Sequence, residues 1–133
     1  MNRYLSAYLA TAVVMIALDM LWLGVIAKPL YQQGLGHLMA ERPNLVAAVA
    51  FYVLYTLGLL LFTILPNAAE PGWLKTTTTA AMFGLIAYAT YDLSNLATLK
   101  DWPVVLSLLD MAWGATISAV SATAGRIAWD RFA

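Results

Sequence analysis

Three aspartates stand out because each lies within a long run of apolar residues. Asp19, Asp92 and Asp110 are surrounded by aliphatic, small and aromatic residues, and no lysine or arginine lies within the same runs. A charged side chain in the middle of a membrane costs at least about 2.5–3.5 kcal/mol, so acids at such positions are functional candidates. A proton, a bound cation or a partner outside the chain must balance their charge. Proton relays, cation sites and general acid–base catalysts all use such carboxylates.

Aromatic and amide residues share helix faces with these acids. Trp22 follows Asp19 by three residues and Trp113 follows Asp110 by three, a spacing that places each pair on one side of a helix. Tyrosine hydroxyls and side-chain amides donate hydrogen bonds to carboxylates, and polar groups in lipid must find such partners internally. The sequence therefore predicts an acidic, aromatic-lined intramembrane pocket that binds a substrate or cation, formed by Asp19, Trp22, Tyr88, Tyr91, Asp92, Asn95, Asp110 and Trp113.

The elements that must position these residues are membrane-spanning helices. Of the 133 residues, 62% are hydrophobic and 11% are charged, against roughly 45–50% and about 25% in a soluble domain. Apolar runs of about 20 residues are long enough to cross a bilayer as helices. We expect a polytopic all-α membrane protein, a four-transmembrane-helix bundle forming a single membrane domain over residues 1–133, with helices at about 5–27, 45–65, 76–98 and 104–125. The segment from Lys28 to Asn44 is predicted to be a connecting loop.

Counting along these helices places the three acids at one depth. Asp19 lies about nine residues before the end of the first run, and Asp92 about six before the end of the third. Asp110 lies about six residues after the start of the fourth. At about 1.5 Å per residue, all three lie roughly 9–14 Å inside the same face of the membrane. The pocket is therefore expected to open toward the first and third connections.

A short sequence repeat relates the first run to the fourth. Leu18-Asp19-Met20-x-Trp22 recurs as Leu109-Asp110-Met111-x-Trp113. With four spans, the first and fourth helices run antiparallel, so the two copies would face each other as an inverted pair, as in transporters built from inverted repeats.

Lysine and arginine are distributed almost evenly between the two ends of such a bundle. Four fall on the side of the termini and three on the other: Arg3, Lys75, Arg126 and Arg131 against Lys28, Arg42 and Lys100. Positive charge in short loops favours the cytoplasmic side. Both termini are therefore expected in the cytoplasm.

Several classes of function are excluded or disfavoured by composition. The formal net charge is zero, so no basic surface is available for nucleic acid. The chain has no cysteine, which excludes disulfides and thiol catalysis. His37 lies in the first connection, and because no metal-binding spacing accompanies it, we predict no metal site. The sequence identifies no cofactor.

The chain resembles a family of small four-helix bacterial membrane proteins known as domain of unknown function 2177. The resemblance covers essentially the whole chain. It is carried by Leu18-Asp19-Met20-x-Trp22, by Tyr91-Asp92-Leu93-Ser94-Asn95 running on to Asp101-Trp102-Pro103, and by Asp110-Met111-x-Trp113-Gly114. It implies a multi-pass protein of the bacterial inner membrane and brings no particular activity.

Three functions compete on the sequence alone. The first is a small carrier in which the acids bind a proton or cation coupled to a small-molecule substrate. The second is a membrane-embedded enzyme that modifies a lipid or isoprenoid, with the carboxylates as general acid and base or as ligands for a divalent metal. The third is a structural or assembly subunit of a larger membrane complex, in which the polar layer fixes helix packing. The expected partners are the lipid bilayer, a cation or small molecule, and further copies of the chain or a larger complex.

Overall fold

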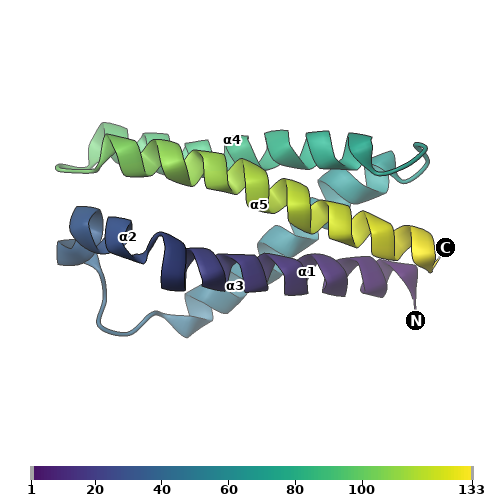
Figure 1. Cartoon of the computed structure of the whole chain (residues 1–133), viewed down its shortest axis with the longest axis horizontal. Coiled ribbons are helices and arrows are strands. Elements are labelled where there is room, and N and C mark those ends of the chain that lie inside the picture. The colour runs from purple at the N-terminus through teal and green to yellow at the C-terminus, as the bar shows by residue number, and fades with distance from the viewer. Residues whose placement is uncertain (1, 133) are drawn as a thin grey trace.

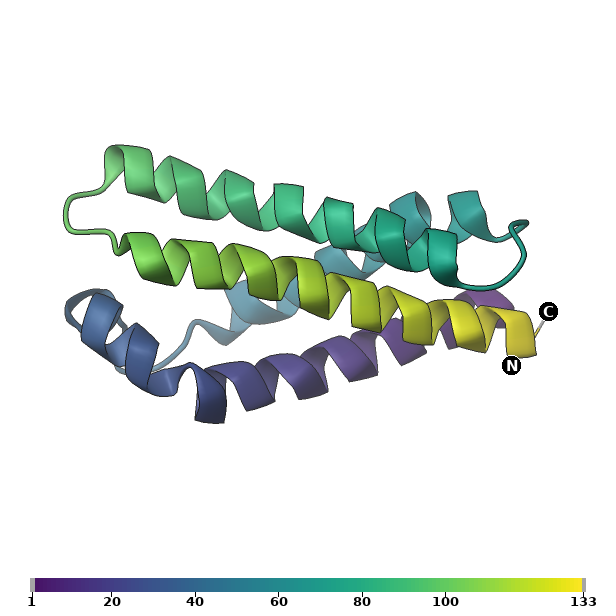
Figure 2. The same ribbon diagram turned by 45° about the horizontal axis from the view of Figure 1, so that its top comes forward.

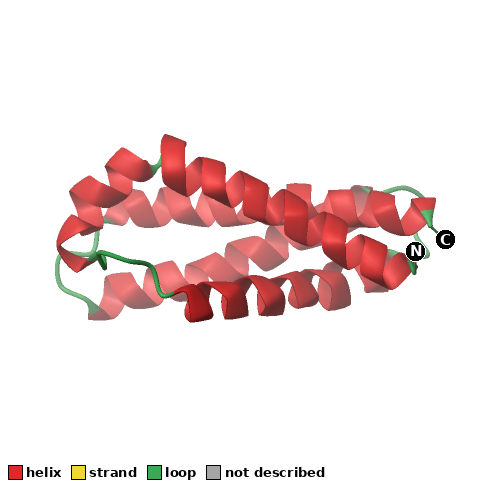
Figure 3. Ribbon diagram, turned by 90° about the horizontal axis from the view of Figure 1, so that it is seen from below, coloured by secondary structure: helices red, strands yellow, loops and turns green. Residues whose placement is uncertain are grey.

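The computed structural model describes residues 2–132, and within them the fold is all-α, as predicted. Figure 3 shows helices joined by short loops. Five α-helices are present: α1 (Arg3–Leu21), α2 (Lys28–Leu35), α3 (Leu45–Leu59), α4 (Leu74–Thr98) and α5 (Val104–Arg131). Two π-helical segments extend α1 and α3, namely η1 (Trp22–Ile26) and η3 (Leu60–Ile64). Two short 3₁₀ helices are η2 (Gly36–Leu38) and η4 (Leu65–Asn67).

The prediction of a loop from Lys28 to Asn44 is wrong for its first part, which forms α2 and η2. Pro29 lies in the first turn of α2, where a missing backbone N–H costs nothing and the fixed φ favours a helix. Gly34 lies inside α2 and gives room for the third connection, because a Cβ atom there would meet Pro103 Cγ at 2.8 Å. The proline and glycine therefore shape a helix here instead of excluding one.

The long helices pack along one axis, with both termini at the same end (Figures 1 and 2). α4 and α5 run antiparallel and side by side, and α1 lies along α5. α3 crosses this layer obliquely, and α2 lies at the end opposite the termini. Asparagines start two of the helices: Asn2 accepts from Tyr4 N at 2.7 Å, and Asn44 accepts from Ala47 N at 3.1 Å.

Within the described residues, three helical stretches are long and apolar enough to cross a membrane: Arg3–Ile26, Leu45–Asn67 and Val104–Arg131. α4 is 25 residues long, but its threonines, tyrosines, Asp92 and Asn95 lower its mean hydropathy. Apolarity alone thus supports three candidate spans, one fewer than the sequence prediction. Many outward side chains are hydrophobic, including Val46 at 81% and Leu54 at 71% exposed, as expected for surfaces that face lipid.

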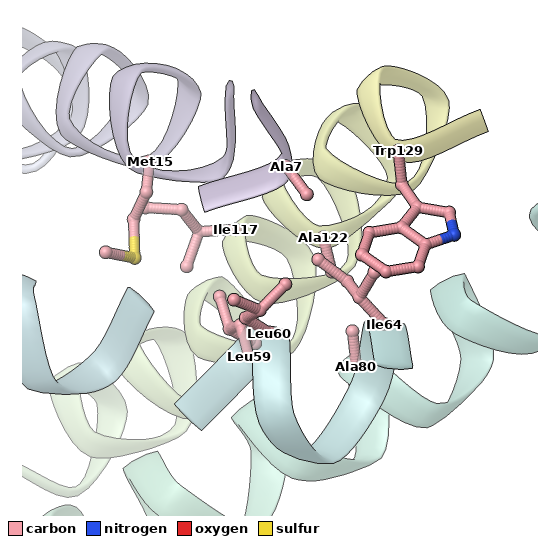
Figure 4. Packing of buried hydrophobic residues seen from close by; sticks show 9 residues of the cluster. All are labelled: Ala7, Met15, Leu59, Leu60, Ile64, Ala80, Ile117, Ala122 and Trp129. Carbon is pink, nitrogen blue, oxygen red and sulfur yellow. The ribbon is translucent and has the colours of Figure 1, made fainter. Parts of the chain in front are cut away.

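Figure 4 shows the buried core, to which α1, α3, η3, α4 and α5 contribute side chains. It consists of Ala7, Met15, Leu59, Leu60, Ile64, Ala80, Ile117, Ala122 and Trp129. Close packing between α4 and α5 depends on glycines, because a Cβ on Gly84 would collide with Gly114 O and Ser118. This contact fixes how α4 is rotated against α5.

Arg126 departs from the sequence interpretation, which placed it beyond the fourth helix. α5 continues to Arg131, and Arg126 is only 2% exposed. Its guanidinium donates to Asn67 O and Glu70 O, both at 2.6 Å, and pairs with Asp130 at 3.0 Å. One buried side chain thus ties the α3–α4 connection to α5.

Candidate functional site

A cavity of about 550 Å³ lies in the half of the bundle near α2, and all five α-helices contribute to its walls. Six of the eight residues expected from the sequence line it: Asp19, Trp22, Tyr88, Tyr91, Asp110 and Trp113. Other aromatic residues complete the walls, among them Tyr31, Phe51, Tyr52 and Tyr55. The structure therefore brings two of the three acids into one aromatic cavity.

Asp19 lies in the last turn of α1 and is held by two donors from other helices. The hydroxyl of Tyr52 on α3 donates to Oδ2, and Trp113 Nε1 on α5 donates to Oδ1 at 3.2 Å. The side chain is 7% exposed. Because both donors are neutral, they stabilise the carboxylate without cancelling its charge.

Asp110 is contacted by a residue that the sequence analysis missed. Tyr31 on α2 donates its hydroxyl to Asp110 Oδ1 at 2.7 Å. Burial, together with the nearby Asp110 carboxylate, raises the pKa of the Tyr31 phenol well above its ordinary value. Tyr31 therefore stays protonated and remains a hydrogen-bond donor at neutral pH. The sequence signal that could have revealed Tyr31 is Pro29, because a proline often stands in the first turn of a helix and would have predicted a helix containing Tyr31.

Asp92 lies against Asp110 but does not line the cavity. Its side chain is 2% exposed, and its Oδ2 atom has no hydrogen-bond partner among residues 2–132. Asn95, one turn further along α4, also lies outside the cavity wall. A buried carboxyl beside a second carboxyl favours a shared proton or a bound cation, since two adjacent negative charges repel.

Aromatic contacts hold the cavity walls in place. Trp22 and Trp113 stack, and the Tyr88 ring occupies the space that a side chain at position 114 would need. Tyr55 and Ser118 share a hydrogen bond of 2.7 Å. These contacts join η1, α3, α4 and α5 around the same space.

No cation of the described chain neutralises the three acids. The ion pairs within residues 2–132 are Lys75–Glu70 at 3.5 Å and Arg126–Asp130 at 3.0 Å, and neither involves the cavity. His37 lies on η2 with an exposed side chain. In this part of the chain, no three histidine, cysteine, aspartate or glutamate side chains are grouped to hold one metal ion. Carboxylates can hold a proton or a cation, and aromatic faces attract cations.

Comparison with known proteins gives one match. A family model described as "Predicted membrane protein (DUF2177)" matches residues 4–127. No curated protein and no solved structure matches the chain.

Proposed function

The chain belongs to the DUF2177 family of predicted membrane proteins, and on that premise we propose that it is a small carrier with four spans whose acidic cavity binds a proton or a cation. The observation that carries this proposal is a cavity of about 550 Å³ containing Asp19 and Asp110 with no basic side chain in its wall. Intramembrane acids without a basic partner are the chemistry of proton relays and cation sites. A small-molecule substrate coupled to that ion completes the proposal.

Burial along α4 supports its role as the fourth span. Its polar Thr76 and Asp92 are buried, whereas Met82 and Ile86 are 64% and 61% exposed. The exposed hydroxyls of Thr90 and Ser94 donate to carbonyls of their own helix, which satisfies them without water. An outer face of this kind is compatible with hydrocarbon, so we place α4 in the bilayer beside α5.

Four spans in the bacterial inner membrane place both termini on one side, which we propose to be the cytoplasm. Single cysteines can test this because the natural chain has none. In right-side-out vesicles, an impermeant maleimide should label Ala40→Cys and Asp101→Cys directly. Ala69→Cys should react only after the membrane is broken. Labelling of Asp101→Cys and Ala69→Cys from the same side would show that α4 does not cross.

Infrared difference spectroscopy in lipid nanodiscs tests the ion site. Carboxyl bands should respond to pH or to an added ammonium ion, and Asp19→Asn, Asp92→Asn and Asp110→Asn should each remove part of that response. Asp101→Asn is the matched control, because Asp101 is exposed in a connection and its φ of 62° suits asparagine. If no carboxyl responds and the three variants only lower thermal stability, the acids are packing elements and the assembly-subunit hypothesis replaces the carrier.

A lipid-modifying enzyme is the second candidate. It is favoured by Asp92 and Asp110 lying side by side, since adjacent carboxyls can act as general acid and base. Chemical change of a lipid extract incubated with the protein, lost in Asp110→Asn, would favour this alternative. A homo-oligomer remains part of the carrier proposal, and the mass of the protein in detergent tests it.

A further inference from the structure

A second hollow, of about 320 Å³, lies between α3 and α4 on the flank of the bundle; we call it the α3–α4 groove. Nine residues line it, and all of them except Tyr55 and Gly58 are hydrophobic. Leu54 and Phe62 belong to its wall and are 71% and 62% exposed, so the groove is open on the outside. In a membrane that outside is hydrocarbon.

The groove adjoins the acidic cavity. Phe51, Tyr55 and Ala87 line both hollows, so these three residues form a wall that the two hollows share. A molecule lying across this junction would have one end beside Asp19 and Asp110 and the other among apolar side chains. The two hollows together thus match a ligand with a charged end and an apolar end.

Aromatic packing keeps the groove from closing. Gly58 places no side chain in it, and a Cβ atom there would meet Phe83 Cζ at 3.2 Å. Phe83 in turn lies against Tyr55 at 5.6 Å and Phe62 at 6.1 Å between ring centroids. Rigid rings on both helices hold α3 and α4 apart at this level.

We propose that the cavity binds an amphipathic amine with a single alkyl chain, which reaches it from the bilayer with its chain in the α3–α4 groove. This inference rests on the proposed function, because it needs the acids to bind a cation. The ammonium group would lie between carboxylates and the faces of aromatic rings, which both attract it. A phospholipid is disfavoured because its phosphate would lie against the same acids.

The groove fixes where the alkyl chain lies but adds little to the affinity for the amine. An alkyl chain in the bilayer is already out of water, so moving it into an apolar groove gains little free energy. What the groove supplies is a fixed path that delivers the headgroup to the depth of Asp19. The location of the chain is therefore the quantity to measure.

Photolabelling in phosphatidylcholine nanodiscs tests this location. A dodecylamine with a diazirine on its chain should label α3 and α4 around the groove, and dodecyltrimethylammonium should displace it while dodecyl sulfate should not. Leu54→Trp, which fills the groove from its exposed wall, should remove most of the labelling around the groove, because the chain must then lie elsewhere in the bilayer while its headgroup stays bound. Val53→Trp is the matched control, since Val53 is the neighbouring residue, is 55% exposed and lies outside the groove, and it should leave labelling unchanged.

Labelling spread over all lipid-facing helices, or equal effects of Leu54→Trp and Val53→Trp, would overturn the inference. The infrared response to tetramethylammonium, which has no chain, separates this failure from that of the proposed function. If tetramethylammonium shifts the carboxyl bands and Asp19→Asn reduces the shift, the cation site stands and only the groove is wrong. If neither ammonium compound shifts them, both proposals fail.

Discussion

The indole rings of Trp22 and Trp113 stack face to face, with 4.6 Å between their centroids and 6° between their planes. They come from the two copies of the repeated Leu-Asp-Met-x-Trp sequence, so the repeat does bring its halves together. Their hydrogen bonds are not symmetrical. Trp113 Nε1 donates to Asp19, whereas Trp22 Nε1 is buried without a partner among residues 2–132. At Asp110, the donor is the hydroxyl of Tyr31 and not the indole of Trp22.

Because of this asymmetry, we expect a tryptophan-to-phenylalanine substitution to lower the free energy of unfolding by different amounts at positions 22 and 113. Trp22→Phe and Trp113→Phe both keep an aromatic ring, but only Trp113→Phe removes the donor to Asp19. Trp113→Phe should therefore lower the free energy of unfolding by about 1–2 kcal/mol more than Trp22→Phe. Thermal unfolding in nanodiscs measures the difference. Equal losses would mean that the indole–carboxylate bond contributes nothing.

Tyr31→Phe should loosen α2 from the bundle. It removes the hydroxyl that donates to Asp110 and should destabilise the protein by about 1–2 kcal/mol. Hydrogen exchange over α2 should increase at the same time. Tyr4→Phe is the control, because Tyr4 is half exposed and contacts Trp129 through its ring, which phenylalanine retains. If the two variants behave alike, α2 is held by packing alone.

Gly114→Ala should separate α4 from α5. A Cβ atom at this position would overlap the rigid ring and Cβ of Tyr88, so the backbone must move. We expect a loss of about 1–3 kcal/mol in the free energy of unfolding and a changed cavity. Gly36→Ala provides the contrast, since no heavy atom lies within 4 Å of a Cβ there. A Gly114→Ala protein as stable as Gly36→Ala would contradict the close approach of the helices.

Arg126→Lys should cost more than about 2 kcal/mol although the charge is kept. Lysine cannot reach two carbonyls and a carboxylate at once, so Asn67 O or Glu70 O would lose its donor. Arg131→Lys, at an exposed position five residues later, should be neutral. Unfolding in detergent compares the two, and a neutral Arg126→Lys would show that these carbonyls find other donors.

Apolar runs predicted most of the fold, because helix length and the absence of charge are local properties of a sequence. The membrane class and the all-α fold are confirmed, and helices lie over all four apolar ranges. Pro29 and Gly34 misled the prediction because the same residues begin or pack a helix when a neighbouring segment lies close. Arg126 was misplaced because its partners at positions 67 and 70 are distant in sequence.

For the candidate site, the sequence predicted which two acids lie close together, but it did not predict how α4 is rotated. Counting residues placed Asp19 and Asp110 at one level, where the structure has them around one cavity. Whether Asp92 and Asn95 point into that cavity depends on the rotation of α4, which the contact of Gly84 with Gly114 sets. No spacing within a single helix contains that information. The roles of all eight residues remain predictions.

Arg126 also has a mechanical consequence. It fastens the bundle near the termini, while the cavity lies 16 residues earlier on α5, about 24 Å away along the helix. If α5 tilts about Arg126, the displacement grows with distance along the helix. A tilt of about 5° moves the helix by about 2 Å at Asp110. Ile117 of the buried core lies nine residues before Arg126, so the same tilt would move it by only about 1 Å, and the space around the acids would change more than the core does.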